Sequence, residues 1–509
     1  MSSRIETFAD HGASRELTCD VCIVGSGAGG AVVAAGLAEA GLDVVILEEG
    51  SHLGRRDFTL HEGDAYPAMY QERGSRATAD AGITILQGRS VGGSTTINWT
   101  TCFRTPERIL AHWARHHGLD GLDLDAHFAA VEARLSIAPW PVEPNANNSK
   151  LREGAEALGW SWEVLRRNVN GCANSGYCGL GCPVDGKQGM GITYLPDALA
   201  AGARVLANVR VERLETAGGK VVAVHGRAMS AGAPVPDGPA IVVRPKVVVT
   251  ACGAINGPAL LLRSGLDAGG LVGRRTFLHP VLGAVGWYPE RVNPFWGAPQ
   301  SVGSHEHIDR GPDRMGYFFE AAPMQPMLSA VALGLYGDEL HELMRELPHL
   351  SALIALAVDG LLPGDEGGVV RLGGEGRPVL DYPIGPALQE AWREATVDLV
   401  RLHLAAGAEL VGTPHVPLML IRTEAELDRV RQASYASGHV TGLSAHQMGG
   451  CAMGSDPARH VVDAEHRFRG VPNLFVVDGS VLPTALGVNP SETIYALAHR
   501  ARRFVGEAV

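Results

Sequence analysis

The sequence is short of charged residues, basic clusters and long apolar runs. Only 19% of its 509 residues are charged and 6% are aromatic, and 55 acidic against 43 basic residues give a formal net charge of -12. Because no basic run of the nucleic-acid-binding type is present, nucleic acid is a poor partner. No window approaches the ~18 apolar residues of a membrane span, and the stretch from Met1 to Leu17 does not resemble a signal peptide. We therefore expect a cytoplasmic protein with no transmembrane segment.

Cysteine is scarce for this length, with eight residues, which argues against a disulfide framework. Cys19 and Cys22 fall on one expected strand, where residues three apart point to opposite faces. Cys172, Cys178 and Cys182 share a Gly-rich loop and leave three interpretations open: free or structural thiols, a disulfide, or ligands of an iron-sulfur cluster. A fourth ligand for a cluster is not evident, and we predict no metal site.

Glycine is abundant, with 65 residues that gather in discrete clusters beside apolar runs. The first cluster lies in CDVCIVGSGAGGAVVAAGLAEAGLDVVILEE, residues 19–49, which predicts a buried strand, a glycine turn, an Ala-rich helix and a second strand. Helical periodicity follows over residues 105–162, and short β segments follow over 203–254. The last segment, residues 473–509, predicts a strand, a long turn and an amphipathic helix.

The pattern GSGAGG has the spacing of a dinucleotide-binding turn. Gly25 permits the tight turn, Gly27 lets the backbone approach a pyrophosphate beside Ala28, and Gly30 permits close packing of helix on strand. Glu48 ends the second strand, where a carboxylate can accept hydrogen bonds from a ribose. The fingerprint alone fits NAD or FAD, whereas an acid in place of an Arg disfavours NADP.

Further glycine clusters distinguish the two cofactors. The chain resembles the glucose-methanol-choline (GMC) family of FAD-dependent oxidoreductases in four segments besides the fingerprint: GRSVGGSTTIN at 88–98, VVVTACGAINGPALLLRSG at 247–265, SAHQMGGCAMG at 444–454, and VVDGSVLPTALGVNPSETIYALA at 476–498. Within this family, CGLGCPVDGKQ at 178–188 is most similar to long-chain alcohol oxidases. The resemblance implies an α/β fold with a discontinuous Rossmann-like FAD-binding lobe and a mixed-sheet substrate-binding lobe.

The resemblance also implies which residues contact FAD. Residues of the second cluster are expected near the flavin and ribityl region: Arg89, Gly92, Gly93, Ser94 and Asn98. Val211 is expected at the adenine through its backbone, Asp478 and Gly479 along the phosphates and ribityl chain, and Pro490 and Thr493 close to the isoalloxazine ring.

Alcohol oxidation removes a proton from oxygen and a hydride from carbon. His446 occupies the catalytic position of the family, and a histidine can act as a base near neutral pH. The second position of the pair is Asn489, whose amide can hydrogen-bond the alcohol oxygen and does not compete as a base. We therefore predict His446 as the base and Asn489 as the anchor of the oxygen.

The expected division of the chain places residues 16–105, 186–270 and 440–509 in the FAD-binding domain and 106–185 and 271–439 in the substrate-binding domain. The middle of the chain holds two apolar stretches, Met324 to Leu335 and Leu353 to Leu362, which favour an apolar alcohol if they line the cavity. The expected reaction produces an aldehyde or ketone, and dioxygen reoxidises the flavin to give hydrogen peroxide.

Three alternatives stay open. The chain could be a flavoprotein dehydrogenase that passes electrons to a quinone or cytochrome, possibly through a cluster on the loop of three cysteines. It could be a flavin lyase or photodecarboxylase, although the pair of His446 and Asn489 argues against that chemistry. A non-catalytic flavin-binding protein is the third, and no catalytic position is lost.

Overall fold

The computed structural model describes residues 5–509 and begins with the predicted βαβ unit. β1 (Arg15–Val24) leads through the glycine turn into α1 (Ala28–Glu39), and β2 (Val44–Leu47) returns parallel to β1. All of β2 and the second half of β1 are buried, as the apolar runs of the sequence predict. The strand, turn, helix and strand predicted over residues 19–49 are thus confirmed.

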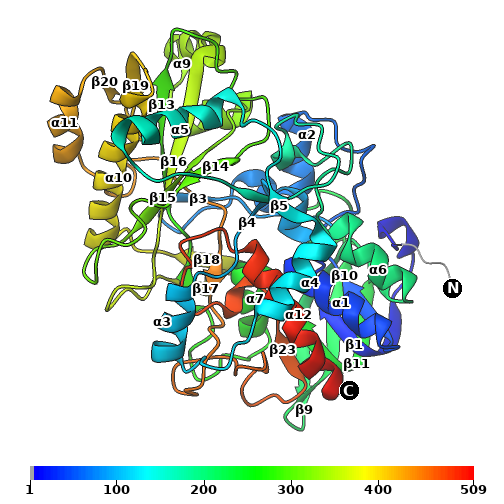
Figure 1. Cartoon of the computed structure of the whole chain (residues 1–509). Coiled ribbons are helices and arrows are strands. Elements are labelled where there is room, and N and C mark those ends of the chain that lie inside the picture. The colour runs from blue at the N-terminus through cyan, green and yellow to red at the C-terminus, as the bar shows by residue number, and fades with distance from the viewer. Residues whose placement is uncertain (1–4) are drawn as a thin grey trace.

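A seven-stranded sheet is built around this unit and fills the lower right part of Figure 1. Its order is β8-β2-β1-β11-β10-β9, and β23 also pairs with β11. β10 pairs with the start of β11 and β23 pairs with its end, so a strand from the C-terminal part of the chain completes the sheet. The additional strands are β8 (Arg204–Leu206), β9 (Val209–Ala217), β10 (Lys220–Ala228), β11 (Ala240–Thr250) and β23 (Leu474–Val476).

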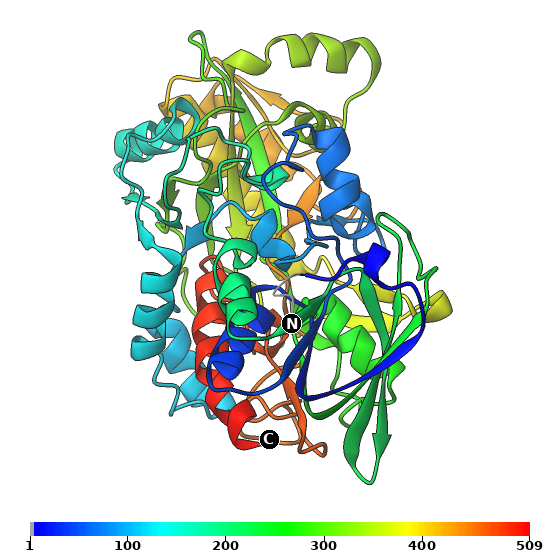
Figure 2. The same ribbon diagram turned by 90° about the vertical axis from the view of Figure 1, so that its right-hand side faces the viewer.

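A nine-stranded sheet forms the upper part of the molecule, above the first sheet in Figures 1 and 2. α5 (Ala146–Leu158) and α10 (Pro386–Ala405) pack together against it. Its order is β20-β19-β13-β16-β15-β14-β6; β21 also pairs with β13, and β3 pairs with β21. The strands are β3 (Ile83–Ile85), β6 (Glu163–Val164), β13 (Val281–Trp287), β14 (Val302–Ser304), β15 (Tyr317–Ala321), β16 (Leu350–Ala357), β19 (Leu410–Gly412), β20 (Leu420–Ile421) and β21 (Gly442–Ser444).

Two small sheets complete the β structure: β18-β17-β12-β22 and β4-β7-β5. Their strands are β12 (Arg274–Phe277), β17 (Gly368–Leu372), β18 (Pro378–Asp381), β22 (Met448–Gly449), β4 (Thr101–Cys102), β5 (Ile137–Pro139) and β7 (Arg166–Asn168). The other helices are α2 (Glu62–Met69), α3 (Glu107–His117), α4 (Asp125–Leu135), α6 (Tyr194–Ala200), α7 (Gly253–Arg263), α8 (Pro326–Ala332), α9 (Gly337–Arg345), α11 (Leu427–Gln432) and α12 (Ser491–Glu507).

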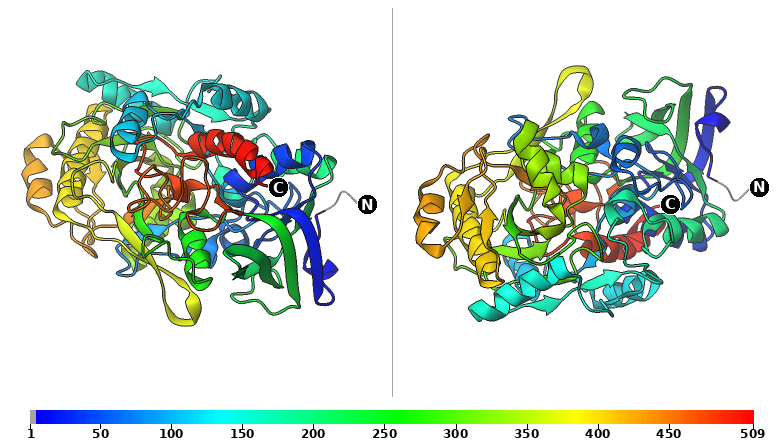
Figure 3. Two further views of the ribbon diagram at one scale, coloured as in Figure 1. Left: turned by 90° about the horizontal axis from the view of Figure 1, so that it is seen from below. Right: turned by 90° about the horizontal axis from the view of Figure 1, so that it is seen from above.

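The C-terminal helix α12 packs against both α1 and α4, and Figure 3 shows it in red beside these blue and cyan helices. Its buried face includes Tyr495, Ala498, Ala501 and Val505, which recur with helical spacing. This packing fixes the turn that precedes α12, where Asn489 lies. Of the helices found in residues 5–509, none combines the length and the apolar character needed to cross a membrane.

Candidate active site

A single cavity of about 1310 Å³ connects the glycine turn with the nine-stranded sheet. Its wall includes Gly25 and Glu48 near one sheet, His446 and Asn489 in the middle, and Ile354 of β16. Segments that are far apart in the sequence thus border one space. The cavity divides by its lining into a dinucleotide part, at the glycine turn, and an apolar part, at α8, β13 and β16.

The glycine turn is packed so closely that side chains would not fit. Gly25 has φ +103°, and a Cβ atom there would lie 2.3 Å from the carbonyl oxygen of Ala251. A Cβ atom on Gly29 would lie 1.8 Å from the carbonyl oxygen of Val477, and one on Gly30 would lie 2.0 Å from that of Gly25. The N-terminus of α1 therefore faces the cavity as bare backbone, whose first-turn amides can bind a diphosphate.

Glu48 lies at the C-terminal end of β2 and faces the cavity. Its Oε2 accepts hydrogen bonds from the Ser26 amide at 2.9 Å and the Ser26 hydroxyl at 2.7 Å, and its Oε1 accepts from the Gly50 amide at 2.7 Å. Burial raises the pKa of Glu48, and these hydrogen bonds oppose the rise. Oε2 thus uses both of its lone pairs, whereas Oε1 has a further lone pair that can accept from a ribose hydroxyl.

The loop over residues 88–98 passes directly over the glycine turn. Gly93 has φ +56°, and a Cβ atom on it would lie 2.8 Å from the Cα atom of Gly27. Arg89 pairs with Glu49 at 2.9 Å. The loop contributes Arg89, Gly93, Ser94 and Asn98 to the cavity wall, whereas Gly92 lies behind it and donates its amide to the Ser26 hydroxyl at 3.0 Å.

The C-terminal segment closes the opposite side of the dinucleotide part. Asp478 accepts hydrogen bonds from the Ser480 amide at 2.8 Å and the Gly253 amide at 2.7 Å, and burial raises its pKa. The cavity wall also includes Ala28, Val211, Gly479 and Pro490. Thr493 and Gly30 do not line the cavity, and the Thr493 hydroxyl instead lies 2.9 Å from that of Thr105.

His446 and Asn489 meet where the two parts of the cavity join. The His446 Nε2 atom lies 3.3 Å from the Asn489 Nδ2 atom, and both residues line the cavity. Burial lowers the pKa of His446 to about 4, so its imidazole is neutral at neutral pH. The structure thus brings together the two residues predicted to bind the alcohol oxygen, although they lie 43 residues apart.

The apolar part of the cavity lies beyond this pair. Residues of both apolar stretches named in the sequence reach its wall, from α8 and its flanks and from β16. The residues that α8, β13 and β16 contribute within the described chain carry no charge. Six of the wall residues with large or branched side chains are Met324, Leu328, Leu333, Val285, Ile354 and Leu356.

Comparison with known proteins places this geometry in a family. The sequence matches the two GMC oxidoreductase family models over residues 66–281 and 370–498, and a NAD(P)-binding Rossmann-like domain over residues 23–88. The chain belongs to the GMC oxidoreductase family. It is 36% identical to an uncharacterized GMC-type oxidoreductase of Mycobacterium tuberculosis, over 94% of this chain and 74% of that relative. It is 32% identical to a long-chain-alcohol oxidase of Arabidopsis thaliana, over 95% of this chain and 68% of the relative.

Solved structures show the same fold. Pyridoxine 4-oxidase from Mesorbium loti superposes with a TM-score of 0.69 at 20% identity, covering 95% of this chain and 98% of the other. A formate oxidase variant of Aspergillus oryzae gives a TM-score of 0.69 at 14% identity, covering 96% and 98%. The predicted GMC fold with a Rossmann-like lobe is confirmed, and this GMC enzyme is an FAD-dependent oxidoreductase.

The residues present suit FAD. Backbone without side chains surrounds the N-terminus of α1, two buried carboxylates line the same part of the cavity, and the cavity continues to His446. The amides in the first turn of α1 can donate hydrogen bonds to a diphosphate, and Glu48 can accept hydrogen bonds from ribose hydroxyls. The chain therefore supplies groups for the diphosphate and the ribose of the cofactor.

His279 is a buried residue at this site that sequence analysis missed. Its Nδ1 atom lies 3.1 Å from the Nδ1 atom of His446, and the Gly487 amide donates to its Nε2 atom at 3.0 Å. It does not reach the cavity wall. His279 adjoins no glycine cluster and stands 167 residues before His446, so no sequence spacing connects the two.

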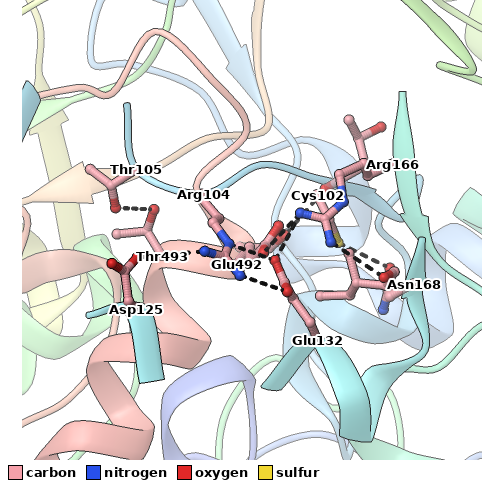
Figure 4. Close-up of polar contacts among 12 residues, drawn as sticks. Cys102, Arg104, Thr105, Asp125, Glu132, Arg166, Asn168, Glu492 and Thr493 are labelled. Atoms are coloured by element: carbon pink, nitrogen blue, oxygen red, sulfur yellow. Dashed lines mark hydrogen bonds and ion pairs between the residues drawn. The ribbon is translucent and has the colours of Figure 1, made fainter. Parts of the chain in front are cut away.

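The carboxyl groups of Glu132, which is partly buried, and Glu492, which is fully buried, lie close together at the start of α12, as Figure 4 shows. Arg104 donates to both oxygens of Glu132 at 2.7 and 2.9 Å, and Arg166 donates to one of them at 2.8 Å. Glu492, in the first turn of α12, is fully buried and hydrogen-bonds Glu132. Burial raises the pKa of Glu492, whereas the bonds from Arg104 lower that of Glu132, so Glu492 holds the proton of the pair.

The three loop cysteines border a separate, much smaller cavity together with Lys187. All three are free thiols of intermediate exposure. Lys187 is buried and donates to the carbonyl oxygens of Asn98 and Cys178 at 3.1 and 2.8 Å, which ties this loop to the loop over the glycine turn. Within residues 5–509, no group of three or more His, Cys, Asp or Glu side chains is placed to hold a metal ion.

Proposed function

We propose that this GMC enzyme oxidises an apolar alcohol, of medium or long chain or of bulky hydrophobic shape, to the aldehyde or ketone. The observation that carries the proposal is the continuity of the cavity: the space at His446 and Asn489 opens onto uncharged walls from α8, β13 and β16. A sugar or a quaternary ammonium substrate would need several convergent polar or anionic side chains, whereas these elements contribute no charged side chain and a single hydroxyl group, that of Ser329.

FAD bound in the dinucleotide part would supply the hydride acceptor of the reaction. The residues proposed to hold it are Gly25, Gly27, Ala28, Glu48, Arg89, Gly93, Ser94, Asn98, Val211, Asp478, Gly479 and Pro490, all of which line the cavity. Gly30, Gly92 and Thr493 lie behind this wall and are proposed to support it without contacting FAD. We propose residues 16–105, 186–270 and 440–509 as the FAD-binding domain and 106–185 and 271–439 as the substrate-binding domain. β3 and β21 lie in the first set of segments and pair with the sheet of the second, so the two domains share a border.

His446 and Asn489 are proposed to bind the alcohol oxygen and to exchange its proton. Both line the cavity at the boundary of its two parts, and the imidazole is neutral because burial lowers its pKa to about 4. A neutral imidazole can donate with one nitrogen and accept with the other, which suits proton exchange at a hydroxyl group. The long-chain-alcohol oxidases among the relatives support both the substrate class and dioxygen as the terminal acceptor, which would yield hydrogen peroxide.

A series of straight-chain primary alcohols tests the proposal. Flavin reduction would be followed by rapid-mixing absorbance, and peroxide would be measured separately. Each methylene that enters the apolar part should add about 0.8 kcal/mol of binding, or about fourfold in kcat/KM, until the cavity is filled. Equal efficiency for ethanol and octanol, or a preference for glucose or choline, would reject the apolar substrate class. Reduction by alcohols without peroxide would favour the dehydrogenase alternative.

Two neighbouring residues of α8 offer a matched pair of variants. Ala332 lines the cavity, whereas Val331 is 70% exposed and does not. Ala332→Trp should shorten the preferred alcohol and leave the shortest alcohols little affected, because the indole ring narrows the apolar part. Val331→Trp should keep the chain-length profile of the unmodified enzyme. The same profile in both variants would show that α8 does not border the alcohol.

A further inference from the structure

We propose that His279 fixes the tautomer of His446, so that resting His446 carries its imidazole proton on Nε2 and presents it as a hydrogen-bond donor to the alcohol oxygen. The tautomer itself does not depend on the proposed function. Only the identity of the ligand that faces the Nε2 proton, an alcohol, rests on it. His279 is a positioning residue in this scheme, because it acts through His446 and does not reach the cavity wall.

The direction of the hydrogen bonds begins at the backbone. The Gly487 amide can only donate, and its nitrogen lies 3.0 Å from the His279 Nε2 atom. That Nε2 atom must therefore carry a lone pair. The burial of His279 lowers its pKa well below the usual value, so its imidazole is neutral and has one proton, which must be on Nδ1.

The proton on His279 determines the state of His446. The two Nδ1 atoms lie 3.1 Å apart, a distance that suits one N–H donor and one acceptor. Because His279 donates there, His446 must accept with Nδ1. A neutral His446 then has its proton on Nε2, the nitrogen on the side of Asn489 and the cavity.

The proposed tautomer also determines the orientation of the Asn489 amide. Its Nδ2 atom faces the His446 Nε2 atom at 3.3 Å, which would set two donors against each other, while its buried Oδ1 atom has no hydrogen-bond partner among the described residues. The oxygen and nitrogen of an amide group are exchangeable by half a turn of the side chain, whereas a peptide amide cannot be reversed. Exchanging them removes the conflict and gives Oδ1 a donor in His446. The carboxyl group of Glu320 also hydrogen-bonds the Asn489 amide, and burial raises the pKa of Glu320 to about 8, so this carboxyl group holds a proton near neutral pH and can donate to the exchanged Oδ1.

His279 is held in place by contacts that do not depend on His446. It adopts a left-handed backbone conformation with φ +44°, which is uncommon for a residue with a side chain. Asp359 accepts from the amides of Leu278 and His279 at 2.8 and 3.1 Å and from the Tyr382 hydroxyl at 2.6 Å. The imidazole packs edge-on against Phe318. These contacts keep the Nδ1–H group aimed at His446.

The chemical consequence concerns the alcohol oxygen. A donor at this oxygen favours its negatively charged form and so lowers the pKa of the bound hydroxyl group. The base role that the residue type suggests needs a lone pair on Nε2, which this tautomer does not offer in the resting enzyme. In the resting enzyme His446 therefore binds the alcohol oxygen as a hydrogen-bond donor.

Nitrogen NMR of the FAD-bound enzyme with ¹⁵N-labelled histidine tests the tautomer directly. His446→Gln and His279→Asn identify the two signals among the 20 histidines. We expect His446 to be protonated on Nε2 and bare on Nδ1, with the reverse for His279. A proton on Nδ1 of His446 with a bare Nε2 would overturn the proposal. This result does not depend on any substrate, so it stands even if no alcohol reduces the flavin and the proposed function fails.

Two variants of similar size test the consequence. The side-chain amide introduced by His279→Asn can still donate to His446, whereas the carboxylate introduced by His279→Asp can only accept and should force the proton of His446 onto Nδ1. Flavin reduction by alcohol should fall by less than about 10-fold in the first variant and by about 10²-fold or more in the second. Reduction in His279→Asp as fast as in His279→Asn would contradict the donor role. FAD content and thermal unfolding confirm that both variants fold, and the NMR measurement on the unmodified enzyme decides the tautomer if they do not.

Discussion

The two parts of the cavity present different chemical groups to their ligands. The dinucleotide part is lined by backbone at Gly25, Gly27 and Gly93 and by the carboxylates of Glu48 and Asp478. The apolar part is lined by aliphatic side chains such as Leu328 and Ile354. Backbone amides and carboxylates form directional hydrogen bonds, which fix where the polar atoms of a ligand lie. Aliphatic side chains form contacts without direction and limit mainly the size of the ligand. The first part thus suits one cofactor, and the second suits apolar groups of different shapes.

This difference predicts that the two parts can be impaired separately. His446 lies at their boundary, and within the described chain its imidazole hydrogen-bonds His279 and Asn489, of which neither is proposed to hold FAD. His446→Ala should therefore retain about one FAD per chain while flavin reduction by alcohol falls about 10²- to 10⁴-fold. Rapid-mixing absorbance measures the reduction. Unchanged reduction would remove His446 from the mechanism.

The complementary change impairs the dinucleotide part. Glu48→Ala removes the carboxylate proposed to accept from the ribose and leaves the Ser26 and Gly50 amides without their acceptor. FAD affinity should fall by about 10- to 100-fold, since hydrogen bonds to charged groups contribute about 1.5–3 kcal/mol. Flavin reduction per bound FAD should be nearly unchanged. Loss of reduction at full FAD occupancy would show that the two parts are coupled.

The carboxyl pair of Glu132 and Glu492 lies at the start of α12, the helix that follows Asn489, and its effect on stability should depend on pH. The pKa of Glu492 is raised in the folded state, so folding binds a proton there and the free energy of unfolding falls as pH rises above the ordinary value of about 4.5. Glu492→Gln cannot titrate but can still donate to Glu132. Its stability relative to the unmodified enzyme should grow by about 1.4 kcal/mol per pH unit between about pH 5 and 7.

Urea unfolding at several pH values measures this difference. Glu507→Gln, in the last turn of the same helix, removes an exposed carboxylate that pairs with Arg503 and serves as the control. It should reproduce the pH dependence of the unmodified enzyme. If the free energy of unfolding depends on pH in the same way for Glu492→Gln and the unmodified enzyme, Glu492 does not hold a proton in the folded state.

The smallest effect is expected outside both parts of the cavity. Cys172, Cys178 and Cys182 line a separate small cavity, so replacing all three by Ser should lower stability slightly, by about 0.5–1 kcal/mol per site, and change kcat by less than about twofold. Thermal unfolding and steady-state kinetics measure the two quantities. Stoichiometric iron in the unmodified enzyme would instead support the electron-transferring alternative.

The dinucleotide part was predictable because its signals are local. The strand, turn, helix and Glu48 follow one another directly in the sequence, and each has a composition dictated by close backbone packing, such as Gly29 and Gly30. The amphipathic helix α12 was also predicted, since its buried residues recur with helical period. The resemblance to a family supplied the rest of the predicted site.

The apolar part and His279 depend on tertiary contacts that spacing does not reveal. Apolar runs at α8 and β16 look the same in sequence whether they fill a core or line a cavity, and only packing distinguishes the two. His279 is held in position by its left-handed backbone conformation and by the hydrogen bond from its amide to Asp359, which is 80 residues away. Such a contact leaves no periodic or motif signal in a single sequence.

The position of β23 has a consequence for the biosynthesis of the enzyme. β23 inserts beside β11, the carbonyl group of Val477 lies against Gly29, and Asp478 closes the cofactor site, so a wall of that site is synthesised long after the fingerprint. A nascent chain that still has this segment inside the ribosome possesses the N-terminal fingerprint without a complete binding site. We therefore expect FAD to bind only after β23 has emerged from the ribosome.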